Sequence, residues 1–129
     1  MTDFSITKQV TGEKIDTRWR AQRHGQEVTV PGTLDPSKFE ALGFKAGDVL
    51  PSGTALAKLS SGLRGPFVAG EGAVLDGYLN DDAGVVLTKQ PTCAVLKHGV
   101  IEIAYLPIAA QRATVKAAKT DGSYIYIED

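Results

Sequence analysis

The stretch TCAVLKHGVIEIAYL, residues 92–106, is the part of the chain that indicates the fold class most directly. Apolar and β-branched residues dominate two short runs, 92–96 and 100–106, and the tripeptide Lys-His-Gly at 97–99 separates them. A glycine at the end of so short a connection supplies the positive φ that a tight hairpin turn requires. The sequence therefore predicts a β-hairpin over these residues.

Further strand candidates lie on both sides of this stretch. They are short, rich in alternating or β-branched residues, and bounded by turn signals such as Pro31-Gly32, Pro51-Ser52-Gly53 and the run from Asn80 to Gly84. Short strands with turn signals every eight to twelve residues are typical of mainly β domains. The candidates are residues 27–30, 54–60, 73–79, 85–87 and 123–127.

Two segments favour helix instead. Asp35 followed by Pro36 has the pattern of an N-cap and a first helical residue, which predicts a short helix through about Leu42 that ends at Gly43. Residues 107–119 contain five alanines and no internal glycine or proline, which predicts a longer helix. The expected fold class is therefore mainly β, with one longer and one short α-helix.

Length and composition limit the class of protein. A chain of 129 residues with 43% hydrophobic and 22% charged residues can form one domain with a real core. A formal net charge of -1 argues against nucleic acid as the main partner, since phosphate binding needs a basic excess. No apolar run approaches the roughly 18 residues that span a bilayer, and the start of the chain does not have the pattern of a signal peptide. We expect no membrane partner.

The first 25 residues differ from the rest. Their net charge is +2, from five bases and three acids, and their apolar residues stand apart from one another. Phe4, Ile6 and Val10 share the period-2 spacing of a strand, which cannot fold in water without something to lie against. The sequence predicts an extended N-terminal arm over residues 1–25 and a β-rich domain over residues 26–129.

The sequence contains few residues that could bind a metal or act as a nucleophile. His24, His98 and the single Cys93 are too few for a closed zinc site, and one cysteine excludes an intrachain disulfide. Cys93 stands among apolar neighbours, which is typical of a buried small hydrophobe. His98 is expected at a solvated hairpin turn.

The acidic and glycine-rich motifs also favour structure over chemistry. Asp81 and Asp82 could serve acid–base chemistry or bind a cation, but Asn-Asp-Asp-Ala-Gly is the composition of a turn. The Gly70-Glu71-Gly72 motif precedes a strand candidate, whereas a phosphate cradle needs a following helix. We expect no enzymatic activity, no cofactor and no metal.

A basic cluster surrounds the single tryptophan. Lys14, Arg18, Arg20 and Arg23 flank Trp19. Three interpretations remain open: contact with nucleic acid through phosphates and one stacking ring, docking on an acidic protein surface, or a solvated tail.

The middle of the chain resembles a known family. The motifs are LPSGTALAKL at 50–59 followed by Gly-Pro-Phe at 65–67, Asp-Gly at 76–77 before Gly-Val-Val at 84–86, and AVLKHGVIE at 94–102 followed by Leu-Pro at 106–107. Their order is similar to that in the head decoration, or cement, proteins of lambda-like tailed bacteriophages. The matched stretch covers residues 50–107, a little under half of the chain.

The resemblance implies a compact β-clip-like domain that forms a homotrimer and stabilises the capsid. Such proteins are made in the host cytoplasm and sit on the outer surface of the virion head, where they bind the major capsid protein and hold neighbouring capsomers together. In that family the N-terminal segment gains order on the capsid.

The arm supplies the expected capsid-binding residues. An extended segment with alternating apolar residues is suited to adding a strand to a sheet edge of another protein. We expect Phe4, Ile6, Val10 and Ile15 to contact the capsid and Trp19 to be the main anchor, because tryptophan is frequent at binding hot spots. On this view Trp19→Ala weakens capsid binding without changing the thermal midpoint of the free protein.

Two other functions remain open. β-Clip-like domains also occur in ligand-binding proteins and enzymes, which would require a pocket with convergent polar groups. A phage tail or fibre accessory domain would also be trimeric and without chemistry.

Overall fold

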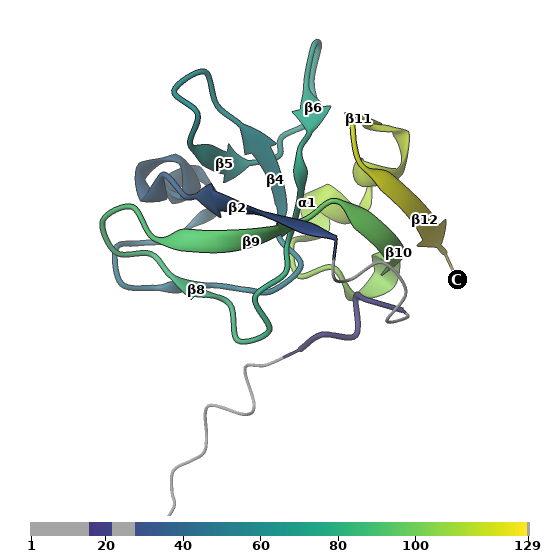
Figure 1. Ribbon diagram of the computed structural model, residues 1–129, viewed down its shortest axis with the longest axis horizontal. Coiled ribbons are helices and arrows are strands. Elements are labelled where there is room, and N and C mark those ends of the chain that lie inside the picture. The colour runs from purple at the N-terminus through teal and green to yellow at the C-terminus, as the bar shows by residue number, and fades with distance from the viewer. Residues whose placement is uncertain (1–15, 22–27, 129) are drawn as a thin grey trace, which may run out of the picture.

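The computed structural model describes residues 16–21 and 28–128, and it confirms the mainly β fold class (Figure 1). Its largest sheet has five antiparallel strands in the order β2-β9-β7-β4-β5. Their bounds are β2 Thr29–Thr33, β4 Ala55–Lys58, β5 Arg64–Pro66, β7 Gly77–Leu79 and β9 Thr92–Leu96.

The two outermost strands of this sheet meet at one end. Leu34, directly after β2, forms a bridge with Arg64 of β5, and the Asp35 amide donates to the Arg64 carbonyl at 2.9 Å. Pro31 and Gly32 lie inside β2 and do not end it as their composition predicts. A proline is tolerated because β2 is an edge strand, where one face of the backbone needs no partner.

Three two-stranded sheets complete the β structure of the described residues. β10 (His98–Glu102) pairs in parallel with β12 (Ser123–Ile127), and β6 (Val74–Leu75) pairs in parallel with β11 (Lys119–Thr120). β3 (Val49–Leu50) pairs antiparallel with β8 (Val85–Val86). The strand candidates at 54–60, 73–79, 85–87 and 123–127 are therefore confirmed, with 73–79 divided between β6 and β7.

The predicted hairpin over residues 92–106 is wrong. β9 pairs with β2 and β7, whereas β10 pairs with β12, so the two strands belong to different sheets. Between them the Lys97 amide donates to the Val28 carbonyl at 2.9 Å, and the Lys97 carbonyl accepts from the Ser123 amide at 2.9 Å. Gly99 does not adopt a positive φ. Partners distant in sequence satisfy both strands, and no tight turn forms.

The short helix is confirmed at its predicted bounds. It is the 3₁₀ helix η2, Pro36–Leu42, whose N-cap Asp35 accepts a hydrogen bond from the Ser37 amide at 3.2 Å. Gly43 ends it with a φ of 92°, a left-handed conformation that glycine adopts without strain.

The alanine-rich segment does not form the longer helix predicted for it. It contains a single α-helical turn, α1 (Ala109–Arg112), then the 3₁₀ turn η4 (Val115–Ala117), while a further 3₁₀ turn, η3, covers Ile103–Tyr105. The Thr114 hydroxyl donates to the Ala110 carbonyl at 3.2 Å at the break, where it competes for helix acceptors. Lys119 is drawn into β11, so pairing with β6 ends the segment as strand.

The core has two clusters of buried side chains. The first lies where β4, β7 and β10 meet the segment that contains η4, and the second lies beneath η2 and β3. The first comprises Trp19, Ala55, Phe67, Leu75, Tyr78, Leu96, Ile101, Leu106 and Val115. The second comprises Leu34, Phe39, Leu50, Leu56, Leu79, Leu87, Cys93 and Val95. Among the described residues, no helix has the length and apolar content needed to span a bilayer.

Candidate functional site

Residues 16–21, here called the root segment, lie against the open edge of β10. The Glu102 amide donates to the Trp19 carbonyl at 2.7 Å, and the Ala21 amide donates to the Val100 carbonyl at 3.0 Å. Arg20 forms an antiparallel bridge with Ile101 between these two bonds. The prediction that all of residues 1–25 lie outside the domain is therefore wrong for the root segment, which is paired with the fold.

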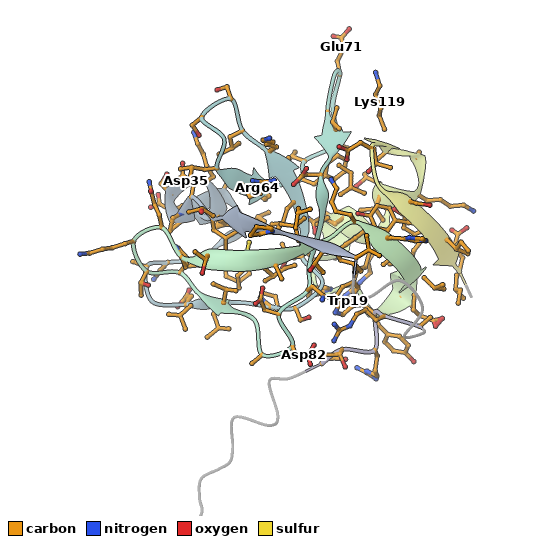
Figure 2. All side chains as sticks on the ribbon, viewed as in Figure 1. Trp19, Asp35, Arg64, Glu71, Asp82 and Lys119 are labelled. Atoms are coloured by element: carbon orange, nitrogen blue, oxygen red, sulfur yellow. The ribbon has the colours of Figure 1, made fainter. Side chains whose placement is uncertain are left out.

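Trp19 is fully buried, which contradicts its predicted role as an exposed anchor for the capsid (Figure 2). Its indole Nε1 donates to the Ser52 hydroxyl at 3.0 Å, and its ring lies 5.8 Å from the Tyr78 ring between centroids. A Cβ at Gly53 would lie 2.8 Å from the indole, so only glycine permits this approach. The ring fills the first core cluster and cannot bind a partner without leaving it.

Arg20 attaches the root segment to a second part of the domain. Its guanidinium donates to the Asn80 side-chain carbonyl at 2.7 Å and forms an ion pair with Asp82. The predicted turn at 80–84 is confirmed, since the Gly84 amide donates to the Asp81 carbonyl at 2.9 Å. The turn that contains Asp81 and Asp82 thus binds Arg20 of the root segment.

Arg18 lies on the surface at the start of the described chain. Its guanidinium stacks 4.3 Å from the centre of the Tyr105 ring and donates to the Asp16 carboxylate at 2.8 Å. These hydrogen bonds from Arg18 lower the pKa of Asp16. A small hollow of about 160 Å³ separates Asp16 and Arg18 from Arg112. Of the predicted basic cluster, Arg18 and Arg20 are therefore paired with acids of this chain.

The remaining predicted site residues cannot be placed. Phe4, Ile6, Val10 and Ile15 lie outside the described residues, as do Lys14, Arg23 and His24.

The residues of the domain that could serve as a nucleophile, a base or a metal ligand do not form a reactive site among the described residues. Cys93 is buried, as predicted, and its burial raises the pKa of the thiol to about 11, which disfavours the reactive thiolate. His98 lies in β10 and not at a hairpin turn. Across residues 16–21 and 28–128, no three His, Cys, Asp or Glu side chains gather as a metal site.

The sequence reasoning missed three groups of buried polar side chains. One is Gln111, whose side-chain amide forms hydrogen bonds with the backbone of β4 and of Phe67. Another is Asp76, held between Arg64 at 2.9 Å and Lys97 at 3.1 Å. Burial by itself raises the pKa of Asp76, but hydrogen bonds from the two cations outweigh burial and lower it. No motif marks these residues, because their partners are distant in sequence.

The third missed group is a set of tyrosines. The Tyr78 and Tyr126 hydroxyls are 2.8 Å apart, and the Tyr124 hydroxyl donates to the Leu96 carbonyl at 2.6 Å. Burial raises the pKa of all three phenols, so they remain neutral. The alternation of Tyr124 and Tyr126 in the sequence was the one available signal.

These features make the root segment the candidate functional site. Its backbone pairing, buried tryptophan and paired arginine hold the chain to the domain at residues 16–21, where Arg18 lies against the Tyr105 ring. No protein-family model, curated protein or solved structure matches the chain.

Proposed function

We propose that this protein is a bacteriophage capsid decoration protein, which binds the outer surface of the head as a trimer and cements neighbouring capsomers. The N-terminal residues 1–15 make the contact with the major capsid protein, and the root segment joins them to the domain. The observation that carries this proposal is the attachment of the root segment by three different kinds of contact.

A cement protein must transmit force between its contact with the shell and its own folded body. A pull on the chain at Asp16 acts along the root segment, where two backbone hydrogen bonds to β10 resist it. Extracting the Trp19 ring would empty a core position, which costs about 3–5 kcal/mol for a large aromatic side chain. Arg20 adds a charged contact to the 80–84 turn. These contacts would keep the root segment in place when a force pulls on the N-terminal residues.

The sequence pattern before the root segment supports the same function. Phe4, Ile6 and Val10 have the spacing with which an added strand places side chains in pockets on one face. Ordering a backbone costs about 1–2 kcal/mol per residue, so one arm binds weakly. Arms on one trimer that engage together gain affinity through effective concentration.

Deleting residues 2–15 tests the function without damaging the core. Removal of residues 1–25 would also remove Trp19, so a shorter deletion is needed. We expect the deletion to weaken co-sedimentation with expanded, undecorated phage heads by about tenfold or more. We expect the thermal midpoint of the free protein to stay unchanged, since the contacts of the root segment with β10, Ser52, Tyr78 and the 80–84 turn all remain.

Paired substitutions test whether head binding depends on the apolar side chains of the arm or only on the presence of the arm. Phe4→Ser with Ile6→Ser removes two residues of one parity, and Ser5→Ala with Thr7→Ala changes the other parity as a matched control. The first pair is expected to lose head binding and the second to retain it. Undiminished sedimentation of the deletion variant would show that the arm is not the contact.

A further inference from the structure

Residues 68–74, here called the finger, form a loop that follows β5, projects from the body of the domain and ends at Val74, the first residue of β6 (Figure 1). The Ala73 amide donates to the Gly70 carbonyl at 3.0 Å, and Gly72 has a φ of 76°, so the tip is a defined turn. Val68 is 66% exposed and Val74 is 43% exposed. Apolar side chains grouped on a projection indicate a contact surface.

A hollow of about 500 Å³ lies beside the finger. One wall is the finger itself, with Ala69 and Ala73, and the other is the segment from Ala113 to Lys119 that contains η4. The lining is small and mostly apolar: Phe67, Ala69, Ala73, Ala113, Ala117 and Ala118. A second hollow of about 440 Å³ lies on the other side of the finger, toward β4 and β5. A projection rich in valine, alanine and glycine is similar in polarity to a hollow with walls of alanine.

The charges of the finger and the hollow are opposite. Glu71, at the finger tip, is the single charged residue between Arg64 and Asp76, whereas residues 107–120 carry three bases and no acid. Lys116 pairs with Glu128, but Lys119 lines the hollow, and no ion pair joins Lys119 or Glu71 to another residue in the described part of the chain. Figure 2 shows Glu71 and Lys119 at the same end of the molecule.

Within the described residues of one copy, neither packing nor backbone conformation explains why residue 70 is glycine. Its φ is not in the left-handed region, and a Cβ built on it meets nothing within 4 Å. Neither backbone conformation nor packing inside this chain therefore requires glycine there. A second backbone passing close to the finger would require it.

We infer that the finger of one copy lies in the hollow of the next copy, with its Glu71 opposite the Lys119 of that neighbour. Each copy gives one finger and receives one, which is a head-to-tail contact, and such a contact forms a ring where the rotation between copies closes. The number of copies, three, rests on the proposed function. The apolar finger residues then leave water, and Gly70 allows the chains to approach.

Charge reversal with rescue tests this contact. Glu71→Lys and Lys119→Glu each place like charges together at every interface of the ring, and the double variant restores opposite charges. We expect each single variant to raise the concentration at which half of the chains are assembled by about tenfold or more, and the double variant to recover most of the loss. Lys89→Glu, an exposed lysine outside the finger and both hollows, is the matched control and is expected to assemble normally. Light scattering during size-exclusion chromatography measures the assembly.

Gly70→Gln tests the close approach independently of charge. The added side chain points into open space in one copy, so the thermal midpoint measured at a dilution where the chain is monomeric should not fall. Assembly should be lost. A monomeric wild-type chain at all concentrations, or variants at Glu71, Lys119 and Gly70 that all assemble like the wild type, would overturn the inference.

The failure of this inference can be told apart from failure of the proposed function. If the variants assemble normally and the wild type sediments with heads, the finger contact is wrong and the decoration function stands. If the charge variants lose assembly and the double variant regains it, the finger contact is supported even where the wild type does not bind heads.

Discussion

Trp19 shows how one residue type can serve two opposite roles. Tryptophan is enriched both at binding hot spots and in cores, and its basic neighbours favoured the first role in the sequence. Burial was decided by residues more than thirty positions away: Ser52 accepts the indole hydrogen bond and Gly53 leaves room for the ring. The local sequence of the root segment contains neither partner.

Replacing Trp19 with alanine is therefore expected to destabilise the free protein. Loss of a fully buried tryptophan ring leaves a cavity and should lower the free energy of unfolding by about 3–5 kcal/mol. Denaturant titration followed by circular dichroism measures the change. This outcome is the reverse of the one that an exposed anchor predicts.

Trp19→Phe is the conservative companion of that variant. It keeps an aromatic ring but removes the donor to Ser52, so a loss of about 1–2 kcal/mol is expected. An unfolding free energy unchanged by Trp19→Ala would contradict the packing of the root segment on the domain.

At the scale of elements, the prediction of the short helix was confirmed, whereas the prediction of a longer helix in the alanine-rich segment was wrong. Asp35, Pro36 and Gly43 act through local geometry, so their pattern predicted η2 to its bounds. Alanine propensity is also local, but it is worth only tenths of a kcal/mol per residue. Burial of Gln111 and pairing of Lys119 with Val74 outweigh it in residues 107–119.

Gln111 is the side chain that holds α1 to the main sheet. Its Oε1 accepts from the Ala55 amide at 2.8 Å, and its Nε2 donates to the Ala55 and Phe67 carbonyls at 3.0 Å each. Gln111→Ala keeps the helix propensity but removes three hydrogen bonds to buried backbone groups, of which the Ala55 carbonyl alone is shown to keep a partner, the Phe67 amide at 2.9 Å. The expected loss is about 3 kcal/mol of unfolding free energy, measured by denaturant titration.

The exposed neighbour Ala110 provides the control for Gln111. Ala110→Gln introduces the same side chain in the same turn without burial, and its effect should stay within about 0.5 kcal/mol. Equal effects of the two substitutions would show that the hydrogen bonds of Gln111 do not stabilise the fold.

At the scale of the whole molecule, a buried ion network joins elements that are distant in sequence. Asp76, between β6 and β7, accepts from Arg64 of β5 and from Lys97, which lies between β9 and β10. Lys97 also binds Asp121, between β11 and β12, at 2.7 Å. Asp76 and Lys97 together thus connect four parts of the fold.

This network predicts a loss of stability in acid. The pKa of Asp76 is lowered in the folded protein, so its contribution is present above its unfolded pKa and is lost as the pH falls from about 4 toward the folded value. The free energy of unfolding, measured between pH 7 and pH 2.5, should fall over this window. Asp76→Asn should lower stability at pH 7 and flatten the acid slope, and an unchanged slope would contradict the role of Asp76.

The amino-acid sequence by itself determined the features that depend on neighbours along the chain. These are the mainly β class, the cap and end of η2, the turn at 80–84, and the burial of Cys93 among apolar residues. Each follows from backbone preferences or from the alternation of apolar side chains, which act over a few residues.

Tertiary structure alone decided which strands pair, where the root segment lies and which polar side chains are buried. β9 and β10 are adjacent in sequence but belong to different sheets, and Trp19 is buried by contacts with Ser52 and Tyr78. Such contacts form between segments separated by far more residues than local preferences span, and their energies depend on the burial that the whole fold creates. No short stretch of sequence contains that information.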